Sequence, residues 1–343
     1  MTSNPPLQHI HSVPYTNPPS RLRTLDIWLP RTHEAATTTP STLPWIIYIH
    51  GGAWRDPLKT ASDIAPTLHH LVASHPATLS RIGGIASLNY RLSPYPTHAT
   101  QPSDPDDPDR NVQHPQHLRD VVRALRHLRR EQRVRRWVGV GHSCGATLLL
   151  QLVSRIGLDE DADDDDEDDD DDNALGSSSS SAPPPPPPTA AATTQGMHTL
   201  PSGGGPEALL LLAGIYDLPL LLQNHAVPAC AEPVARVYDA FVAGAFGADR
   251  ERYACVSPVA GRFGPERWPE GRLVVLGHSH EDELVEGAQR DVMCVALARE
   301  GWSVGAEGRR ALEVRELKGA HDFLWRDGRQ VAQLIAEVIL RLS

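Results

Sequence analysis

The chain has 343 residues, of which 40% are hydrophobic, enough to bury the core of one large domain or of two ordinary ones. The formal net charge is −11, but 13 of the 43 acidic residues form one run at 159–172, and outside it 30 acidic residues face 32 basic ones. No basic surplus remains to neutralise phosphates, so we expect no nucleic-acid partner.

Other features exclude further classes of protein. No apolar run reaches the roughly 18 residues that span a bilayer, so we expect no membrane partner. Residues 1–20 lack the charged start and apolar core of a secretory signal and predict a flexible N-terminal extension. The four cysteines include no CxxC pair, which argues against a zinc site or a disulfide framework. These features favour a cytoplasmic protein with free thiols.

Predicted strands and helices alternate up to residue 158. Residues 21–29 alternate polar and apolar side chains, as in a half-exposed strand, and residues 117–130 carry apolar side chains on one helix face. The predicted strands are 21–29, 45–49, 85–90 and 137–140. The predicted helices are 61–74, 117–130 and 146–156.

Residues 159–205 differ in composition from the rest of the chain. The acidic run is followed by five consecutive serines, six prolines and three glycines. Such a segment buries too little apolar surface to offset its ordering entropy, so we predict a disordered insertion. We interpret it as a tolerated loop expansion, the alternative being a docking tail for a basic partner.

The alternation resumes after the insertion. The predicted strands are 208–213, 273–276 and 312–317, and the predicted helices are 234–245, 284–299 and 331–342. Buried strands alternating with amphipathic helices predict an α/β fold whose mainly parallel sheet carries helices on both faces. The insertion interrupts one crossover, so we expect residues 21–343 to form a single domain.

The motif Gly-His-Ser-Cys-Gly at 141–145 lies between a predicted strand and a predicted helix. Gly-x-Ser-x-Gly in this context is typical of a nucleophile elbow, because small residues on either side let the chain double back sharply. The serine then projects above the sheet from the N-terminus of the helix. We therefore predict Ser143 as a nucleophile.

A second motif follows the predicted strand 45–49. It consists of His50, Gly51, Gly52, Ala53 and Trp54. Its glycines let backbone N–H groups turn inward, in the loop where half of an oxyanion hole belongs. We expect the N–H groups of Gly52, Ala53 and Cys144 to bind the negative oxygen of a tetrahedral intermediate, the alternative interpretation being a flexible turn.

A serine nucleophile needs a base and an orienting acid. In this architecture the acid follows the penultimate strand and the histidine follows the last one. We predict Asp282 as the acid, with Glu281 and Glu283 as rivals, although this carboxylate cluster could also cap the next helix. His321 is the only histidine beyond His280 and is the predicted base.

The remaining histidines carry weaker signals. His278 and His280 flank the acid loop and favour a supporting or surface role. His9 and His11, like the pair at 69–70, have no carboxylate or cysteine partner at metal-ligand spacing in the sequence. We therefore predict no metal and no cofactor.

These motifs resemble those of the α/β-hydrolase superfamily, from about residue 21 to the C-terminus apart from the insertion. Within it the chain is most similar to the fungal kynurenine formamidases (arylformamidases). The resemblance rests on 50–54 with Asp-Pro at 56–57, and on 89–93, 141–145, 214–218, 282–284 and 320–323. It implies hydrolysis of N-formyl-L-kynurenine in tryptophan breakdown towards NAD synthesis, a homodimer, and a triad of Ser143, Asp282 and His321.

The residues alone do not distinguish an amide from an ester substrate. A formyl group needs little acyl pocket, whereas the aryl amine needs an aromatic-compatible site, for which Trp54 is a candidate wall and His142 a second lining residue. A carboxylesterase acting on small esters has the same catalytic residues. An inactive hydrolase-fold binding module is the alternative of another class, but such modules usually lose a triad member.

Replacing residues 159–205 with a short Gly/Ser linker is expected to keep turnover within a few-fold of the parent. The helix at 146–156 starts beneath Ser143 and runs away from it, so the insertion lies far from the catalytic loops, and loop length changes stability only slowly. Turnover and thermal midpoint measured beside the parent test this. A folded variant without turnover would make the segment an ordered part of the pocket.

Overall fold

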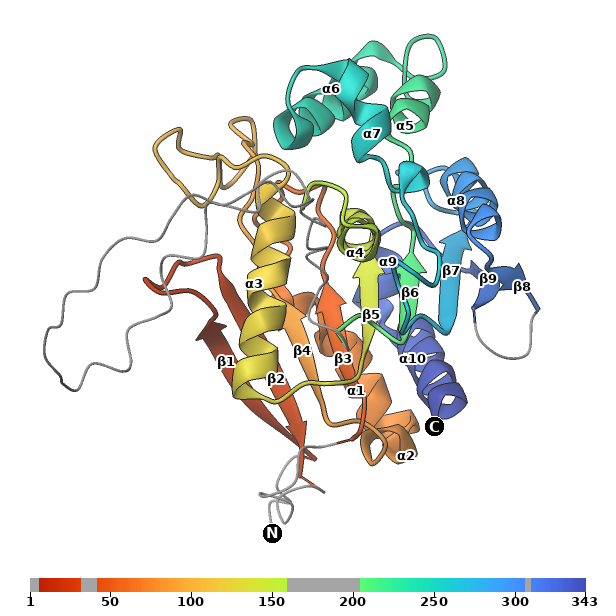
Figure 1. The fold of residues 1–343 in the computed structure, drawn as a ribbon. Coiled ribbons are helices and arrows are strands. Elements are labelled where there is room, and N and C mark those ends of the chain that lie inside the picture. The colour runs from red at the N-terminus through yellow and green to blue at the C-terminus, as the bar shows by residue number, and fades with distance from the viewer. Residues whose placement is uncertain (1–5, 32–41, 159–203, 306–309) are drawn as a thin grey trace, which may run out of the picture.

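The computed structural model describes residues 6–31, 42–158, 204–305 and 310–343. Within them, nine strands form one sheet in the order β1-β2-β4-β3-β5-β6-β7-β9-β8 (Figure 1). The strands are β1 (Leu7–Pro14), β2 (Thr24–Pro30), β3 (Trp45–Ile49), β4 (Gly84–Leu88), β5 (Trp137–His142), β6 (Ala208–Leu212), β7 (Leu273–Ser279), β8 (Ser303–Val304) and β9 (Ala311–Leu317).

Helices connect most of these strands. They are α1 (Ala65–Ser74), α2 (Pro76–Leu79), α3 (Gln116–Glu131), α4 (Cys144–Ser154), α5 (Leu218–Asn224), α6 (Glu232–Phe246), α7 (Tyr253–Val256), α8 (Gly287–Arg299), α9 (Phe323–Asp327) and α10 (Arg329–Leu342). Short 3₁₀ turns lie at Ala61–Ile64, Arg250–Arg252 and Pro258–Ala260. None of the helices in the described parts of the chain is both long and apolar enough to cross a membrane.

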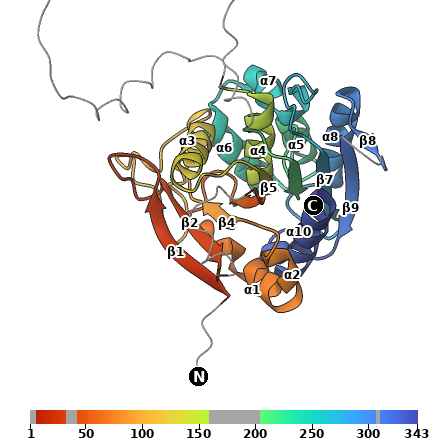
Figure 2. The same ribbon diagram turned by 60° about the horizontal axis from the view of Figure 1, so that its bottom comes forward.

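Side chains that alternate along the central strands divide the core into two layers. Ile47 and Ile49 of β3 pack in the layer of α3 and α4, whereas Ile46 and Tyr48 pack in the layer of α1 and α10 (Figure 2). This alternation is expected of a strand buried on both faces. From β4 to β8 all neighbouring strands are parallel, which confirms the predicted mainly parallel sheet with helices on both faces.

The helices α5, α6 and α7 lie beyond the ends toward which β5, β6 and β7 run (Figure 1). Of these three, only α6 is predicted from the sequence, at 234–245. The Tyr238 hydroxyl of α6 donates a hydrogen bond to the carbonyl of Leu284 at 2.6 Å, and the Phe241 ring lies 6.3 Å from that of Trp54. The segment therefore packs against the loops that carry the predicted catalytic motifs.

The prediction of a flexible extension over residues 1–20 is wrong for Leu7–Pro14, which form strand β1. This strand runs antiparallel to β2, with Leu7 opposite Pro30 and Ile10 opposite Ile27. Leu7 and Tyr15 are buried at its two ends. The strand lies at the sheet edge, where outward side chains stay polar, and its polar composition therefore conceals it in the sequence.

The disordered insertion predicted at 159–205 falls outside the described residues, apart from Gly204 and Gly205. The carbonyl of Gly204 accepts a hydrogen bond from the indole N–H of Trp137 at 3.0 Å. A linker that replaces the insertion should therefore preserve Gly204.

Gly328, between α9 and α10, is expected to be intolerant of a side chain. It has a φ of +73°, and a Cβ there would lie 2.4 Å from the backbone nitrogen of Thr67. Gly328→Ala should lower the free energy of unfolding by about 1–3 kcal/mol, through positive-φ strain and the clash with α1. Denaturant unfolding measures the change.

Gly301→Ala is the matched control, because Gly301 has a φ of +86° and nothing within 4 Å of a Cβ. This control should show the φ strain alone and therefore a smaller loss of stability. Equal losses in the two variants would contradict the contact with α1.

Candidate active site

The turn from β5 into α4 brings Ser143 to the N-terminal end of α4. Its backbone has φ 52° and ψ −124°, a conformation that is strained for a residue with a side chain. The Ser143 N–H donates to the carbonyl of Leu212 on β6 at 2.9 Å, which holds the turn to the neighbouring strand. The sharp turn predicted from the motif is present.

Two glycines allow this turn to pack. A Cβ on Gly145 would lie 2.2 Å from the carbonyl oxygen of Ile49, and one on Gly141 would lie 2.7 Å from the backbone nitrogen of Ala146. Both contacts are with backbone atoms, which cannot rotate away as a side chain could. Gly145 is therefore required by the close approach of α4 to the end of β3, and Gly141 by the sharp return of α4 over β5.

The loop after β3 lies directly against this turn. Gly52, Ala53 and Trp54 all have positive φ, at 99°, 50° and 59°. A Cβ on Gly51 would lie 2.8 Å from His142 Nδ1 and 3.1 Å from the Cβ of Ser143. The structure thus brings the two predicted halves of the oxyanion hole together.

His50 and Tyr90 support the loop from below. The Tyr90 hydroxyl donates to the carbonyl of His50 at 3.1 Å, and the two rings stack with centroids 4.5 Å apart. Burial lowers the pKa of His50 to about 4, so its imidazole is neutral at neutral pH. Because a carbonyl only accepts, the Nδ1–H of His50 donates to the carbonyl of Gly51 at 2.8 Å.

Cys144 contacts the loop through its side chain. Its Sγ accepts a hydrogen bond from the Trp54 N–H at 3.3 Å and lies 3.6 Å from the Tyr90 hydroxyl. Burial raises the pKa of the Cys144 thiol to about 11, although these neighbours act in the opposite direction. The thiol is therefore protonated at neutral pH. It accepts the Trp54 N–H, for which the sequence predicted no role.

Asp282 and His321 meet as predicted. The carboxylate oxygens of Asp282 lie 2.8 and 3.0 Å from His321 Nδ1, and the two side chains are 1% and 5% exposed. Burial alone would raise the pKa of Asp282. Hydrogen bonds from His321 and from the N–H groups of Leu284 and Val285 outweigh it and hold the pKa below its usual range. The carboxylate is therefore ionised and only accepts, so His321 Nδ1 carries the proton and Nε2 is left to accept.

The two rival glutamates do not take the place of Asp282 at the His321 ring. Glu283 Oε2 accepts the backbone N–H of His321 at 3.0 Å, whereas Glu281 is exposed and its N–H donates to Ser279 Oγ at 3.1 Å. Neither carboxylate is among the hydrogen-bond partners of the His321 ring in the described residues. Glu283 instead positions the loop that carries the histidine, a role for which the sequence contains no signal.

His142 holds the same loop from the other side. Its Nε2 lies 3.1 Å from the carbonyl oxygen of His321, and the two rings are 4.5 Å apart. Burial and the nearby His321 keep the pKa of His142 well below its usual value, so the neutral ring donates Nε2–H to that carbonyl. His142 is 2% exposed and Trp54 1% exposed, and the Trp54 and Phe246 rings form a T-shaped pair with centroids 5.0 Å apart. The substrate-pocket role of both residues stays a prediction.

An ion pair joins the two loops that carry the predicted oxyanion and base residues. Lys59 Nζ lies 2.7 Å from Asp322 Oδ2 and so ties the oxyanion segment to the histidine loop. The partners are 263 positions apart, and no local pattern could have indicated the pair. Among the described residues, no hydrogen bond joins Ser143 Oγ to His321. Such contacts are often long without a bound substrate and tighten only in the complex.

The other histidines near the acid loop take no part in these contacts. His278 is buried at the end of β7, and burial lowers its pKa. His280 is exposed, with Nε2 3.4 Å from Glu316. Both positions agree with the supporting and surface roles expected from the sequence.

No family model matches the chain. A kynurenine formamidase-like hydrolase from Fusarium equiseti is 33% identical to it over 337 residues, covering 97% of this chain and 95% of the relative. A kynurenine formamidase from Aspergillus versicolor is 30% identical over 329 residues, covering 92% and 95%.

Solved esterases share the fold. Esterase B from Lactobacillus rhamnosis superimposes with a TM-score of 0.60 at 12% identity, covering 99% of this chain and 87% of the esterase. A carbohydrate esterase from gut microbiota gives a TM-score of 0.56 at 16% identity, covering 98% of each chain.

Asp282→Asn is expected to lower hydrolysis of a short-chain aryl ester by about 10³- to 10⁴-fold, because the amide no longer fixes the tautomer of His321. Glu283→Gln should cost less than about tenfold, since its amide oxygen still accepts the His321 N–H. The exposed Glu281→Gln is the matched control and should be near neutral. Steady-state kinetics on the three folded variants measure these losses of activity. A larger loss in either glutamate variant than in Asp282→Asn would show that Asp282 is not the acid.

Proposed function

We propose that this chain, which belongs to the kynurenine formamidase family of α/β-hydrolases, hydrolyses N-formyl-L-kynurenine to L-kynurenine and formate. Of two relatives that match nearly the whole chain at 30% identity or more, one is named a kynurenine formamidase and the other a kynurenine formamidase-like hydrolase. The observation that carries the proposal is the buried Asp282–His321 hydrogen bond beside the strained turn at Ser143. A histidine so oriented has the geometry of a general base.

In the proposed reaction Ser143 Oγ attacks the formyl carbon while His321 Nε2 takes the hydroxyl proton. Asp282 stays ionised and stabilises the imidazolium. The negative oxygen of the tetrahedral intermediate is bound by the N–H groups of Gly52, Ala53 and Cys144. The Trp54 N–H donates to Cys144 Sγ.

The intermediate then collapses with cleavage of the C–N bond. His321 gives its proton to the departing aryl nitrogen, and L-kynurenine leaves as a neutral amine. Water, deprotonated by His321, attacks the formyl ester on Ser143, and collapse of the second intermediate returns the proton to Oγ and releases formate. The same residues act in both halves, so no further group is needed.

Aromatic side chains pack together beside the proposed oxyanion loop. Phe241 and Phe246 of α6 lie with ring centroids 6.3 and 5.0 Å from that of Trp54. We propose Trp54 as a wall of the site, with His142 behind the catalytic histidine. A place in tryptophan breakdown towards NAD synthesis, a homodimeric assembly and a cytoplasmic location remain predictions from the sequence.

Ser143→Ala is expected to reduce formate release from N-formyl-L-kynurenine by about 10⁴-fold or more, with the thermal midpoint preserved. The parent should release formate from this substrate with a higher kcat/KM than it hydrolyses a short-chain aryl ester. A preference for the ester would identify a carboxylesterase. A folded parent without activity on either would identify a binding module, and near-parental turnover in Ser143→Ala would remove the nucleophile assignment.

A further inference from the structure

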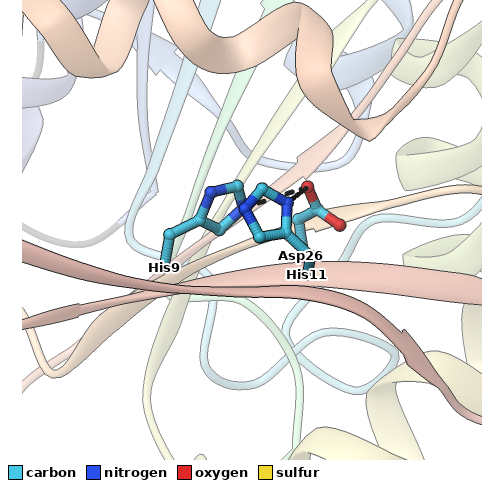
Figure 3. Close-up of side chains that lie close together, drawn as sticks. All are labelled: His9, His11 and Asp26. Carbon is cyan, nitrogen blue, oxygen red and sulfur yellow. Dashed lines mark hydrogen bonds and ion pairs between the residues drawn. The ribbon is translucent and has the colours of Figure 1, made fainter.

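Two histidines and an aspartate converge on the outer strands of the sheet, away from the active site (Figure 3). His9 and His11 come from β1 and Asp26 from β2. Their potential ligand atoms all lie within 4.8 Å of one another. The sequence predicts no carboxylate partner for these histidines, and the structure corrects this, because strand pairing brings Asp26 against them.

The alternation of side chains along β1 and β2 accounts for the convergence. His9 lies opposite Trp28, but the pairing shifts between Ile10 and Val13, and Val13 lies opposite Leu25. This shift is a bulge of one extra residue in β1. His9 and His11 are two positions apart and therefore lie on the same side of β1, where both rings face Asp26 (Figure 3). Ser12, inside the bulge, has a φ of +49°. A strained conformation at this position is maintained only where the surrounding contacts support it.

The contacts around Asp26 orient its carboxylate. The Ser12 N–H donates to Oδ1 at 2.8 Å, which leaves Oδ2 facing the two imidazoles. His9 Nε2 lies 3.0 Å and His11 Nδ1 3.7 Å from Oδ2. The His9 ring is held further by stacking on Trp28, with centroids 4.2 Å apart. Asp26 is nearly buried, whereas the His11 side chain is 71% exposed and leaves the group open to solvent.

These distances suit a small divalent ion. Four ligand atoms about 2.0 Å from a tetrahedral zinc ion lie about 3.3 Å from one another, between the two distances measured here. Two imidazoles and a carboxylate are a ligand set that such ions favour, with water completing the coordination. A backbone N–H on the second carboxylate oxygen is the kind of outer contact that orients metal ligands.

We propose that His9, His11 and Asp26 bind one divalent transition-metal ion of the zinc type and so fasten β1 to β2. The site lies at the sheet edge, with β4 and β3 between it and β5, which carries the turn at Ser143. It is therefore a structural site, and its occupancy stabilises the fold without taking part in hydrolysis. The alternative is a His9–Asp26 ion pair with no metal.

The other histidine groups of the described residues lack one of these features. His142, His321 and Asp322 are also close together, but His142 Nε2 donates to a carbonyl and Asp322 pairs with Lys59. The neighbouring rings of His69 and His70 lie 5.7 Å apart on α1, and no carboxylate completes a ligand group with them. This pair provides a matched control for adventitious binding by surface histidines.

The first test is Zn²⁺ titration of the metal-free full-length protein by calorimetry, with Mg²⁺ in excess to occupy sites that have only oxygen ligands. The parent should bind one tight equivalent. His11→Ala and Asp26→Asn should each weaken this binding by at least about tenfold. His69→Ala/His70→Ala should bind as the parent does. Because His11 is largely exposed, its variant tests the site even if Asp26→Asn fails to fold.

Two further readouts locate the ion. Zn²⁺ should raise the thermal midpoint of the parent and of the His69→Ala/His70→Ala control but not that of His11→Ala, because binding to the folded state alone is stabilising. Co²⁺ should quench tryptophan fluorescence in the parent, and Trp28→Phe should remove that quenching. Equal Zn²⁺ affinity in the parent and His11→Ala, or no tight equivalent in the parent, would overturn the proposal and leave the ion pair. Neither outcome depends on the formamidase activity.

Discussion

The site depends on one close approach of backbone to backbone, where α4 begins against the end of β3. Gly145 lies so near the carbonyl of Ile49 that a Cβ would come within 2.2 Å of it. The parallel pairing of β3 with β5 places Ile49 opposite Gly141 and so fixes this approach. Two adjacent strands of a parallel sheet thereby deliver the proposed nucleophile and the oxyanion loop to the same point.

His321 is held through its ring Nδ1, its backbone N–H and its carbonyl. The Nδ1–H of His321 donates to Asp282, its backbone N–H donates to Glu283, and its carbonyl accepts from His142. The ion pair of Lys59 with the residue after His321 adds a tie to the oxyanion segment. Only Nε2 is left for proton transfer, and its direction is set before a substrate arrives, as a preorganised site requires.

Cys144 combines two tasks that lie on different atoms. Its N–H is a proposed oxyanion donor, whereas its buried thiol holds the N–H of Trp54. The side chain thus packs against the positive-φ loop that carries the other proposed donors. Tyr90 completes the arrangement by bonding the carbonyl of His50 beneath the same loop. The conformation of this loop therefore depends on packing as well as on the glycine motif.

Local spacing in the sequence determined the buried strands, the sharp turn at Ser143, the acid loop and the position of His321, because each depends on residues within one turn or one strand. The sequence favoured Asp282 as the partner of the imidazole but left Glu281 and Glu283 as rivals. Only the tertiary structure separated them, since Asp282 contacts the His321 ring whereas Glu283 accepts the His321 backbone N–H. Tertiary structure also decided that residues 7–14 form the edge strand β1, because their polar sequence carries no strong strand signal. It decided the pairing of His9 with Asp26 as well. Contacts between residues distant in the chain follow from strand register and loop packing, which no local pattern encodes.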